Sequence, residues 1–289
     1  MNTERIPRKS KKTPLIVIFL LALVAVIITV VFIFYKVGYR YLKNDNGVKF
    51  LGKVGTVMIG GTAVEGQPYH GKVYYADGTA GTLDMSAGTI SYSNGDKYEG
   101  DIVSLMREGQ GVMTYANGDK YEGSFVADLQ TGKGKFTYAN GDSYEGDLLN
   151  GLRNGTGIYI WADGSKYEGE FKDNLKNGKG VYTWADGSSY DGTYVNDIKN
   201  GTGTYKFSNG DVYIGDFADD LRTGNGTYTW ANGESYTGEF KNNKMDGLGT
   251  YTWPGDPAAR TYTGTFKDGK IVLSDSNDNQ PEGDVGATS

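Results

Sequence analysis

The sequence contains no cysteine and only one histidine, His70. Without cysteine, the chain can form no disulfide, no thiolate metal site and no cysteine nucleophile. One histidine also argues against an ordinary zinc site, which needs several cysteine or histidine ligands. A Ser-His-Asp triad could be built only around His70, and the Gly-x-Ser-x-Gly motif that presents such a serine is missing. We therefore expect no catalytic residue, no metal site and no enzyme activity, and we interpret His70 as a surface residue.

Signatures for bound phosphate and calcium are missing as well. Gly-x-Gly recurs along the chain, but no copy continues into the Gly-x-x-x-x-Gly-Lys-Ser/Thr loop that cradles phosphate. The frequent aspartates and glutamates have neither the EF-hand spacing nor the nonapeptide spacing of calcium-binding repeats. The sequence therefore predicts no cofactor.

Basic residues are scarce outside the first part of the chain. Residues 1–53 hold ten Lys/Arg and two Asp/Glu, whereas the remainder holds 19 and 33, which gives net charges of +8 and −14. Nucleic acids and anionic lipid headgroups attract clustered lysine and arginine, which an acidic body does not offer. We therefore expect no nucleic-acid partner.

One long apolar run is present, the 21 residues from Leu15 to Tyr35, in which Thr29 is the only polar residue. At about 1.5 Å per residue such a helix spans roughly the 30 Å of bilayer hydrocarbon. A cleaved signal peptide has a shorter apolar run of about 7–15 residues and a small-residue exit, whereas bulky Tyr35 and charged Lys36 end this one. We expect a membrane anchor, and a cleaved signal is the alternative. The denser basic cluster precedes the helix, which favours a cytoplasmic N-terminus and a single pass that exports the rest of the chain.

Glycine, in contrast to cysteine, is abundant, with 45 glycines against 6 prolines. Tyrosines recur every 23 residues, each followed two positions later by a glycine and, two positions further on, by an apolar residue. Equal spacing over this length indicates a tandem repeat. The tyrosines are Tyr98, Tyr121, Tyr144, Tyr167, Tyr190, Tyr213 and Tyr236.

A second half-unit keeps the same period, opening with a glycine that an aromatic residue follows four positions later. Four of the eight aromatic residues are tryptophan, a residue enriched where proteins bind partners. We therefore take this column as the candidate binding surface, although its rings could also serve only to pack the sheet. The column consists of Tyr115, Tyr138, Trp161, Trp184, Phe207, Trp230 and Trp253, with Tyr92 as an earlier member.

The two half-units have the alternation of β-strands. Tyr-Glu-Gly-x-Phe and Gly-x-Tyr-x-Trp both alternate with a period of two. Pairs such as Asn117-Gly118 and Asp163-Gly164 separate the second strand of one unit from the first strand of the next. Asn-Gly and Asp-Gly favour two-residue hairpin turns. We expect hairpins that are closed tightly at these pairs and by a longer glycine-containing loop at the other end.

These units resemble MORN (membrane occupation and recognition nexus) repeats. The family pattern runs Tyr-x-Gly-x-Phe/Trp, Gly-x-Gly, an aromatic residue and an Asp/Asn-Gly pair, and residues 167–187 fit it throughout. The resemblance covers about residues 70–270, with departures at Ile214, Thr237 and Thr263, where glutamate is usual. It implies antiparallel hairpins stacked into an elongated, twisted single sheet, in which each repeat contacts mainly its neighbours.

The expected fold is all-β: an elongated single-layer antiparallel sheet of tandem 23-residue MORN-type hairpins, preceded by one transmembrane α-helix. We expect five segments along the chain. The tail is expected to be disordered because it is acidic and has no aromatic residue. The segments are a basic N-terminal arm (1–13), the transmembrane helix (14–36), a basic juxtamembrane linker (37–65), the repeat array (66–272) and an acidic tail (273–289).

Three binding functions remain open. The first is a single-pass, membrane-anchored scaffold that presents its aromatic, acidic surface to a protein partner. The second is an extracellular glycan or cell-wall binding module, since regularly spaced rings flanked by aspartate and asparagine resemble sugar-binding repeats. The third is lipid binding, which the resemblance implies but the acidic body disfavours. Homo-oligomers, with arrays pairing along their edges or ends, are also possible.

Overall fold

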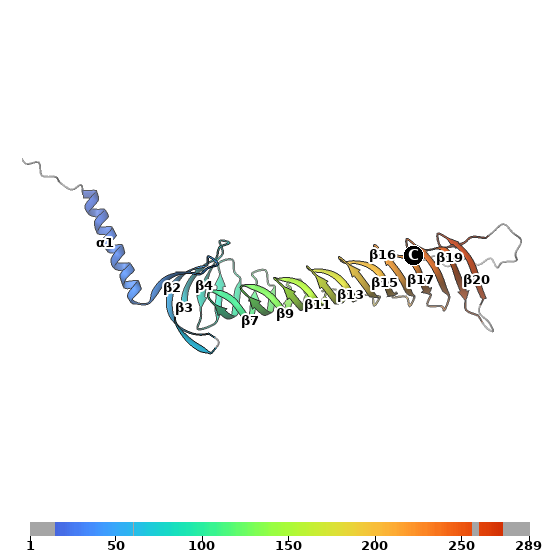
Figure 1. Cartoon of the computed structure of the whole chain (residues 1–289), viewed down its shortest axis with the longest axis horizontal. Helices are drawn as coiled ribbons and strands as arrows, with labels where there is room; N and C mark the ends of the chain where they lie inside the picture. Colours follow the sequence, from blue (N-terminus) through green and yellow to red (C-terminus); the bar gives the residue numbers. More distant parts are fainter. Residues whose placement is uncertain (1–14, 60, 256–259, 274–289) are drawn as a thin grey trace, which may run out of the picture. The chain divides into compact units, whose positions relative to one another are not determined.

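The computed structural model describes residues 15–59, 61–255 and 260–273. The chain divides into two compact units, Met1–Met106 and Arg107–Ser289. The expected basic arm, 1–13, lies outside the described residues, as does the expected acidic tail except for Leu273. All described strands belong to antiparallel hairpin ladders, so the fold class is all-β with one N-terminal apolar helix (Figure 1).

The first unit begins with helix α1, Leu15–Lys36. Among the described residues, this is the one helix long and apolar enough to cross a membrane. It ends at Gly38, which has a φ of +89° and donates a 3.2 Å backbone hydrogen bond to Tyr35. Glycine adopts this left-handed conformation without steric cost, so it is the usual helix terminator.

Six strands follow α1 in the first unit, and consecutive strands pair antiparallel. The segment expected to be a juxtamembrane linker, 37–65, holds the first two of them and the start of the third. The six strands are β1 (Tyr39–Lys43), β2 (Lys49–Ile59), β3 (Thr62–Tyr74), β4 (Ala80–Asp84), β5 (Thr89–Tyr92) and β6 (Lys97–Val103).

In the second unit the strands succeed one another in chain order along a twisted sheet (Figure 1), and consecutive strands from β7 to β21 pair antiparallel. The strands are β7 (Met106–Thr114), which starts at the last residue of the first unit, β8 (Lys120–Val126), β9 (Leu129–Thr137), β10 (Ser143–Leu149), β11 (Leu152–Ile160), β12 (Lys166–Lys172), β13 (Leu175–Thr183), β14 (Ser189–Val195), β15 (Ile198–Lys206), β16 (Val212–Ala218), β17 (Leu221–Thr229), β18 (Ser235–Lys241), β19 (Lys244–Trp253), β20 (Arg260–Lys267) and β21 (Lys270–Ile271).

The register places equivalent residues side by side on one face. Tyr167 of β12 lies opposite Tyr182 of β13, and Gly169 lies opposite Gly180. Because side chains alternate along a strand, all the repeat aromatic residues share this face, here called the aromatic face.

The tight turns lie at the opposite connections from those expected. The Asp163-Gly164 pair belongs to a longer loop, in which Trp161 donates a 2.9 Å backbone hydrogen bond to Ser165 and only the glycine has a positive φ, +90°. The two-residue turns join the first strand of each repeat to its second. At Asp173 and Asn174 the φ angles are +49° and +73°, as a two-residue mirror-image turn requires. The prediction of two-residue turns at Asn117-Gly118, Asp163-Gly164 and the equivalent pairs between repeats is therefore wrong.

Between the two strands of a repeat the sheet contains a bulge that explains the first glycine of Gly-x-Gly. The register shifts between Gly169 and Phe171, and Gly178 on the partner strand has a φ of +105°. The amide of Lys179 donates a 2.9 Å hydrogen bond to the Glu170 carboxylate, which satisfies a group that the bulge removes from the ladder. Equivalent carboxylates, Asp147, Asp216 and Glu239, accept the same bond in other repeats.

The core of the second unit is a row of rings on the aromatic face, here called the inner ladder. Its seven tyrosines are buried, and the hydroxyls of all but Tyr194 donate to a backbone oxygen three residues ahead. They pack edge-to-face on neighbouring rings with centroids 4.8–5.4 Å apart. The inner ladder consists of Tyr121, Phe125, Tyr144, Tyr167, Phe171, Tyr190, Tyr194, Tyr213, Phe217, Tyr236, Phe240 and Phe266.

Candidate functional site

The residues of the predicted binding column lie in a second row of rings, here called the outer ladder. Neighbouring centroids are 4.4–6.1 Å apart, and most neighbouring planes are tilted by 30–54°. Six of the seven predicted residues take part, joined by one further aromatic residue per repeat that the prediction missed. The outer ladder consists of Phe136, Tyr138, Tyr159, Trp161, Tyr182, Trp184, Tyr205, Phe207, Tyr228, Trp230, Tyr251 and Trp253.

Two further residues of the predicted column have contacts of other kinds. The hydroxyl of Tyr115 accepts a 2.7 Å hydrogen bond from the Gln130 amide. Tyr92 belongs to the first unit, where its ring lies 5.7 Å from that of Tyr75. The ring contacts of the outer ladder link the predicted residues from Tyr138 to Trp253.

The tryptophans of the outer ladder are half-buried, unlike the fully buried tyrosines of the inner ladder. The indoles of Trp161, Trp184 and Trp230 each pack between the tyrosines of their own strand and of the next repeat. For Trp161 the centroids of Tyr159 and Tyr182 are 4.5 and 5.0 Å away. The ring faces are thus largely covered by neighbouring rings. Packing and exposure coexist, since part of each indole still reaches solvent.

Carboxylates join the loops of the outer ladder to one another. The Tyr159 hydroxyl donates to Asp142 at 2.7 Å, and the amide of Ala162 donates to the same carboxylate at 2.8 Å. The hydrogen bond from Tyr159 is the main reason why the pKa of Asp142 lies below its ordinary value. Asp211 accepts equivalent bonds from Tyr228 and Ala231. These buried carboxylates hold one loop to the next and are not free acids.

A row of cations, here called the cation row, lies across the inner ladder. Its five members occupy one position of the repeat at 23-residue spacing, and all but Arg107, which lies over Phe125, reach a tyrosine of the outer ladder. Lys176 is typical, with its ammonium 5.8, 4.9 and 5.1 Å from the ring centroids of Tyr167, Tyr182 and Tyr194. Such distances allow attraction between a cation and aromatic rings. The row contains Arg107, Arg153, Lys176, Lys199 and Arg222, with Gln130 and Met245 at the equivalent position of two repeats.

The cation row also links consecutive repeats through their tight turns. The amide of Lys176 donates to the side chain of Asp197 at 2.9 Å, and the amide of Asp197 donates back to the Lys176 carbonyl at 2.9 Å. Burial lowers the pKa of Lys176 and of Lys199. The prediction from sequence missed this row, although its 23-residue spacing is present there.

Arg222 is the most buried cation of the row, with 6% of its surface exposed. Its Nη1 atom forms no hydrogen bond to any described residue. Its Nε atom lies 3.4 Å from the Asn243 side chain, whereas the equivalent Arg107 lies 3.1 Å from the Asp128 carboxylate. Burial lowers the pKa of Arg222, so the charge is held by rings more than by a counter-ion.

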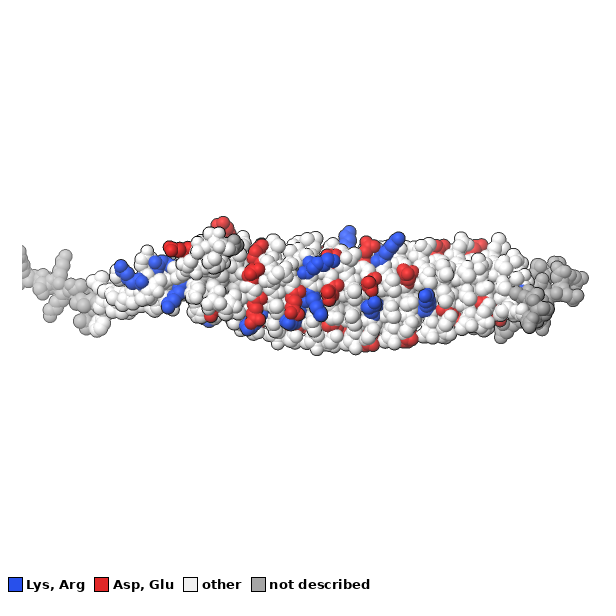
Figure 2. All heavy atoms as spheres, turned by 90° about the horizontal axis from the view of Figure 1, so that it is seen from below, with Lys and Arg blue, Asp and Glu red and all other residues white. Residues whose placement is uncertain are grey.

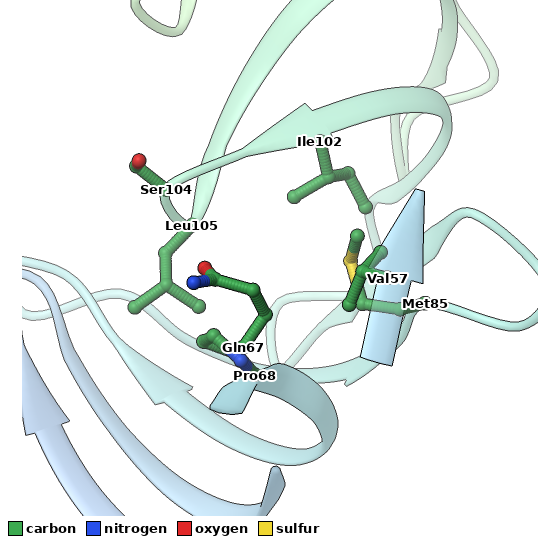
Figure 3. Close-up of a pocket in the computed structure, with 7 residues that line it drawn as sticks. All are labelled: Val57, Gln67, Pro68, Met85, Ile102, Ser104 and Leu105. Carbon is green, nitrogen blue, oxygen red and sulfur yellow. The ribbon is translucent and has the colours of Figure 1, made fainter. Parts of the chain in front are cut away.

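Outside the aromatic face, the first unit has an open hollow of about 430 Å³ over β3, β4 and β5, with Lys72, Thr82 and Ser91 among its lining residues. The cavity of Figure 3 has a volume of about 10 Å³, about the space that one water needs. His70 is exposed and lies 3.6 Å from Asp84, and no cluster of three metal-ligating residues occurs among the described residues. The cavity is lined by Val57, Gln67, Pro68, Met85, Ile102, Ser104 and Leu105.

Acidic and basic side chains are interspersed over the middle of the face shown in Figure 2, which displays no continuous basic patch. Pairs such as Lys120–Glu122 and Lys166–Glu168, each at 3.0 Å, neutralise one another along single strands. A nucleic acid needs a continuous basic surface, and this face does not provide one.

A search among curated proteins found no match. Among solved structures, the TCP domain of SAS-4 (dCPAP) of Drosophila melanogaster, in complex with a proline-rich motif of Ana2, is 18% identical, with 54% of this chain and 84% of that chain covered at a TM-score of 0.36. The TCP10 domain of Danio rerio CPAP, in complex with a STIL peptide, is 13% identical, with 79% and 100% covered at a TM-score of 0.28.

The MORN repeat model matches seven consecutive segments that together span residues 98–255, more than half of the chain. The segments are 98–120, 121–143, 144–166, 167–189, 190–212, 213–235 and 236–255. Proteins of this type are generally non-enzymatic scaffolds. The chain belongs to the MORN repeat family, with seven tandem repeats that form a β-sheet with an aromatic surface.

Proposed function

We propose that this chain is a single-pass membrane protein whose MORN array binds a protein partner through the outer ladder. The proposal rests on the exposure and hydrogen bonding of the four tryptophans in that ladder. Their rings are half-exposed, and no described residue accepts a hydrogen bond from their Nε1–H groups. The inner ladder already supplies the fully buried core. Half-exposed tryptophans on a rigid sheet are the kind of residue that dominates binding energy at protein interfaces.

The membrane part of the proposal rests on α1. Its apolar length suits an anchor, and the basic cluster before it favours a cytoplasmic N-terminus with the repeats outside. A protease-protection assay on intact cells, with an epitope tag after Ser289, tests both points. The tag should be digested from outside, and the membrane-bound protein should retain α1. Protection of the tag would reverse the orientation, and a mature chain beginning after Lys36 would identify a cleaved signal.

Site-specific photo-crosslinking in native membranes tests the binding surface. A photoreactive phenylalanine analogue at position 184 lies in the outer ladder, and the same analogue at position 158 lies on the opposite face of the sheet. We expect a discrete protein adduct from position 184 and none from position 158. Equal adducts from both positions, or none from either, would contradict a binding role for the outer ladder.

Glycan binding is the second candidate and also requires exported repeats. Its support is the regular spacing of the rings, but sugars stack on open ring faces, and neighbouring rings cover most of the faces here. Lipid binding by the array has less support, because residues 54–289 carry a net charge of −14 and repel anionic headgroups.

A further inference from the structure

The outer ladder repeats once for every two strands. Adjacent strands lie about 4.8 Å apart, so equivalent rings of successive repeats recur at roughly 9.6 Å. A polyproline II helix advances about 3.1 Å per residue with three residues per turn, or roughly 9.3 Å per turn. We propose that the outer ladder binds a proline-rich segment in the polyproline II conformation, one turn for each MORN repeat. This inference rests on the proposed protein-binding function of the same surface.

The arrangement of the rings in the outer ladder suits a polyproline II segment. Because three of the four indoles lie between two tyrosine rings, as Trp184 does between Tyr182 and Tyr205 at 4.5 and 5.2 Å, the surface offers ring edges with shallow gaps between them. Proline-rich segments bind grooves lined with aromatic residues, and their extended shape is formed before binding, so little conformational entropy is lost. A glycan needs free ring faces, which this ladder does not offer.

Hydrogen-bonding groups on the two sides also match. A polyproline II segment has no internal hydrogen bonds, so its carbonyl oxygens are free acceptors. The indole N–H groups of the outer ladder are donors without an acceptor among the described residues, and they recur at the repeat spacing. Between Trp161 and Trp253 one repeat lacks this donor, because Phe207 stands at its position. The donors belong to Trp161, Trp184, Trp230 and Trp253.

The charged residues that border the aromatic face indicate which residues should flank the prolines of the partner. Both borders of the aromatic face carry exposed aspartates, Asp163 and Asp186 in the loops and Asp173 and Asp219 in the tight turns. Arginine or lysine residues beside the prolines would therefore be attracted, and acidic flanks would be repelled. The partner is accordingly a basic segment with proline at every third position.

Two peptides test the spacing, with the full-length chain held in nanodiscs of phosphatidylcholine. The first is a fluorescent, arginine-flanked peptide with proline at every third position through five turns. The second has the same composition but irregular proline spacing. Fluorescence anisotropy should show at least tenfold weaker binding of the irregular peptide, because it loses register with successive repeats. Equal affinities of the two peptides, or binding of neither, would overturn the proposal.

Two substitutions at equivalent positions of different repeats test whether the indole N–H donors contribute to binding. Trp184→Phe retains an aromatic ring at a position where the chain already tolerates Phe207, so the fold should persist while affinity falls several-fold. Phe207→Trp completes the row of donors and should raise affinity several-fold. Ile158→Thr, on the opposite face, should change nothing, since threonine occupies the equivalent position at Thr204. Circular dichroism checks the fold of each variant, and unchanged affinity in both ladder exchanges would overturn the proposal.

The controls separate this inference from the proposed function. If neither peptide binds but the analogue at position 184 still captures a protein in membranes, the ladder is a binding surface for a partner of another kind. If chitohexaose binds and the regular peptide does not, the surface is a glycan site. Either result rejects the polyproline partner and still assigns a binding role to the outer ladder.

Discussion

The hydroxyl of Tyr167 donates a 3.0 Å hydrogen bond to the backbone oxygen of Glu170, which lays the tyrosine ring across Gly180. A Cβ atom at Gly180 would lie within 2.6 Å of three atoms of that tyrosine side chain. Contacts this short cannot be accommodated without moving a fully buried ring. The second glycine of Gly-x-Gly is therefore required for space, and the first for its backbone conformation.

Substitution of Gly180 should be costly for that reason. We expect Gly180→Ala to lower the free energy of unfolding by about 3 kcal/mol, the upper range for overpacking a core. Gly164→Ala is the matched control, because its Cβ would meet no atom within 4 Å and only its φ of +90° is unfavourable. That control should cost about 1 kcal/mol. Denaturant unfolding of both variants measures the difference, and equal losses would show that the clash is relieved at no cost.

The partner of Arg222 offers a stabilising substitution. Arg107 faces the carboxylate of Asp128, whereas the more buried Arg222 faces the amide of Asn243. Asn243→Asp would give the buried guanidinium a counter-ion and should stabilise the fold by about 1–2 kcal/mol, as a hydrogen bond between charged groups does. Asn242→Asp, at the exposed first position of the same turn, should have little effect. Thermal unfolding that does not separate the two variants would argue that rings alone satisfy Arg222.

The sequence predicts the repeat, the strands and the shared aromatic face, because a 23-residue period with alternating residues leaves few other arrangements. It does not distinguish the two hairpin connections. Asp163-Gly164 has the composition of a two-residue turn, but the chain places that turn at Asp173-Asn174, where two non-glycine residues have positive φ. Local preference was overridden by the register of the flanking strands, which is a property of the whole sheet.

The candidate site shows the same limit. The period brings Trp161 and Trp184 into one column, and the structure places both in the outer ladder. Burial of Lys176 and Arg222 against rings could not be anticipated, because long basic side chains are usually exposed. Their burial depends on the depth of the aromatic face, which only the assembled sheet defines.

Stability should fall on the alkaline side because buried tyrosines ionise late. Burial raises the pKa of Tyr121, Tyr190 and Tyr236 to about 12, against about 10 in an unfolded chain. A raised pKa in the folded state gives stability that is complete below pH 10 and is lost as the pH rises from 10 to 12. Unfolding followed by circular dichroism should coincide with tyrosinate absorbance in this window. Because tyrosines such as Tyr41 and Tyr74 are exposed, only complete conversion of the tyrosines to tyrosinate near pH 10 without unfolding would contradict the burial of these rings.

At low pH the buried carboxylates change stability in the opposite direction, because their pKa values are lowered by folding, not raised. Burial alone would raise the pKa of Asp211, but hydrogen bonds from Tyr228, Ala231 and Asn209 outweigh it and lower the pKa. Its contribution to stability is therefore complete above the unfolded value of 3.8 and is lost as the pH falls below it. Asp211→Asn should flatten this acidic limb of the stability curve, whereas Asp219→Asn, at an exposed turn position, should leave it unchanged.

Deletion of a whole repeat tests whether contacts are confined to neighbours. Removing residues 144–166 joins Ser143 to Tyr167, so β12 takes the place of β10 and the turns, loops and both ladders keep their sides. We expect a shorter array that unfolds cooperatively at slightly lower temperature, since stability in repeat proteins is close to a sum over units and interfaces. Removing residues 144–154 deletes one strand and its tight turn. Every later strand would then run in the opposite direction, each loop would move to the border that the tight turns occupy, and the rings beyond the junction would no longer meet. This second variant should lose the cooperative transition in circular dichroism and bind a dye that reports exposed apolar surface. Equal thermal transitions of the two variants would contradict an array in which strand direction and ring position are coupled.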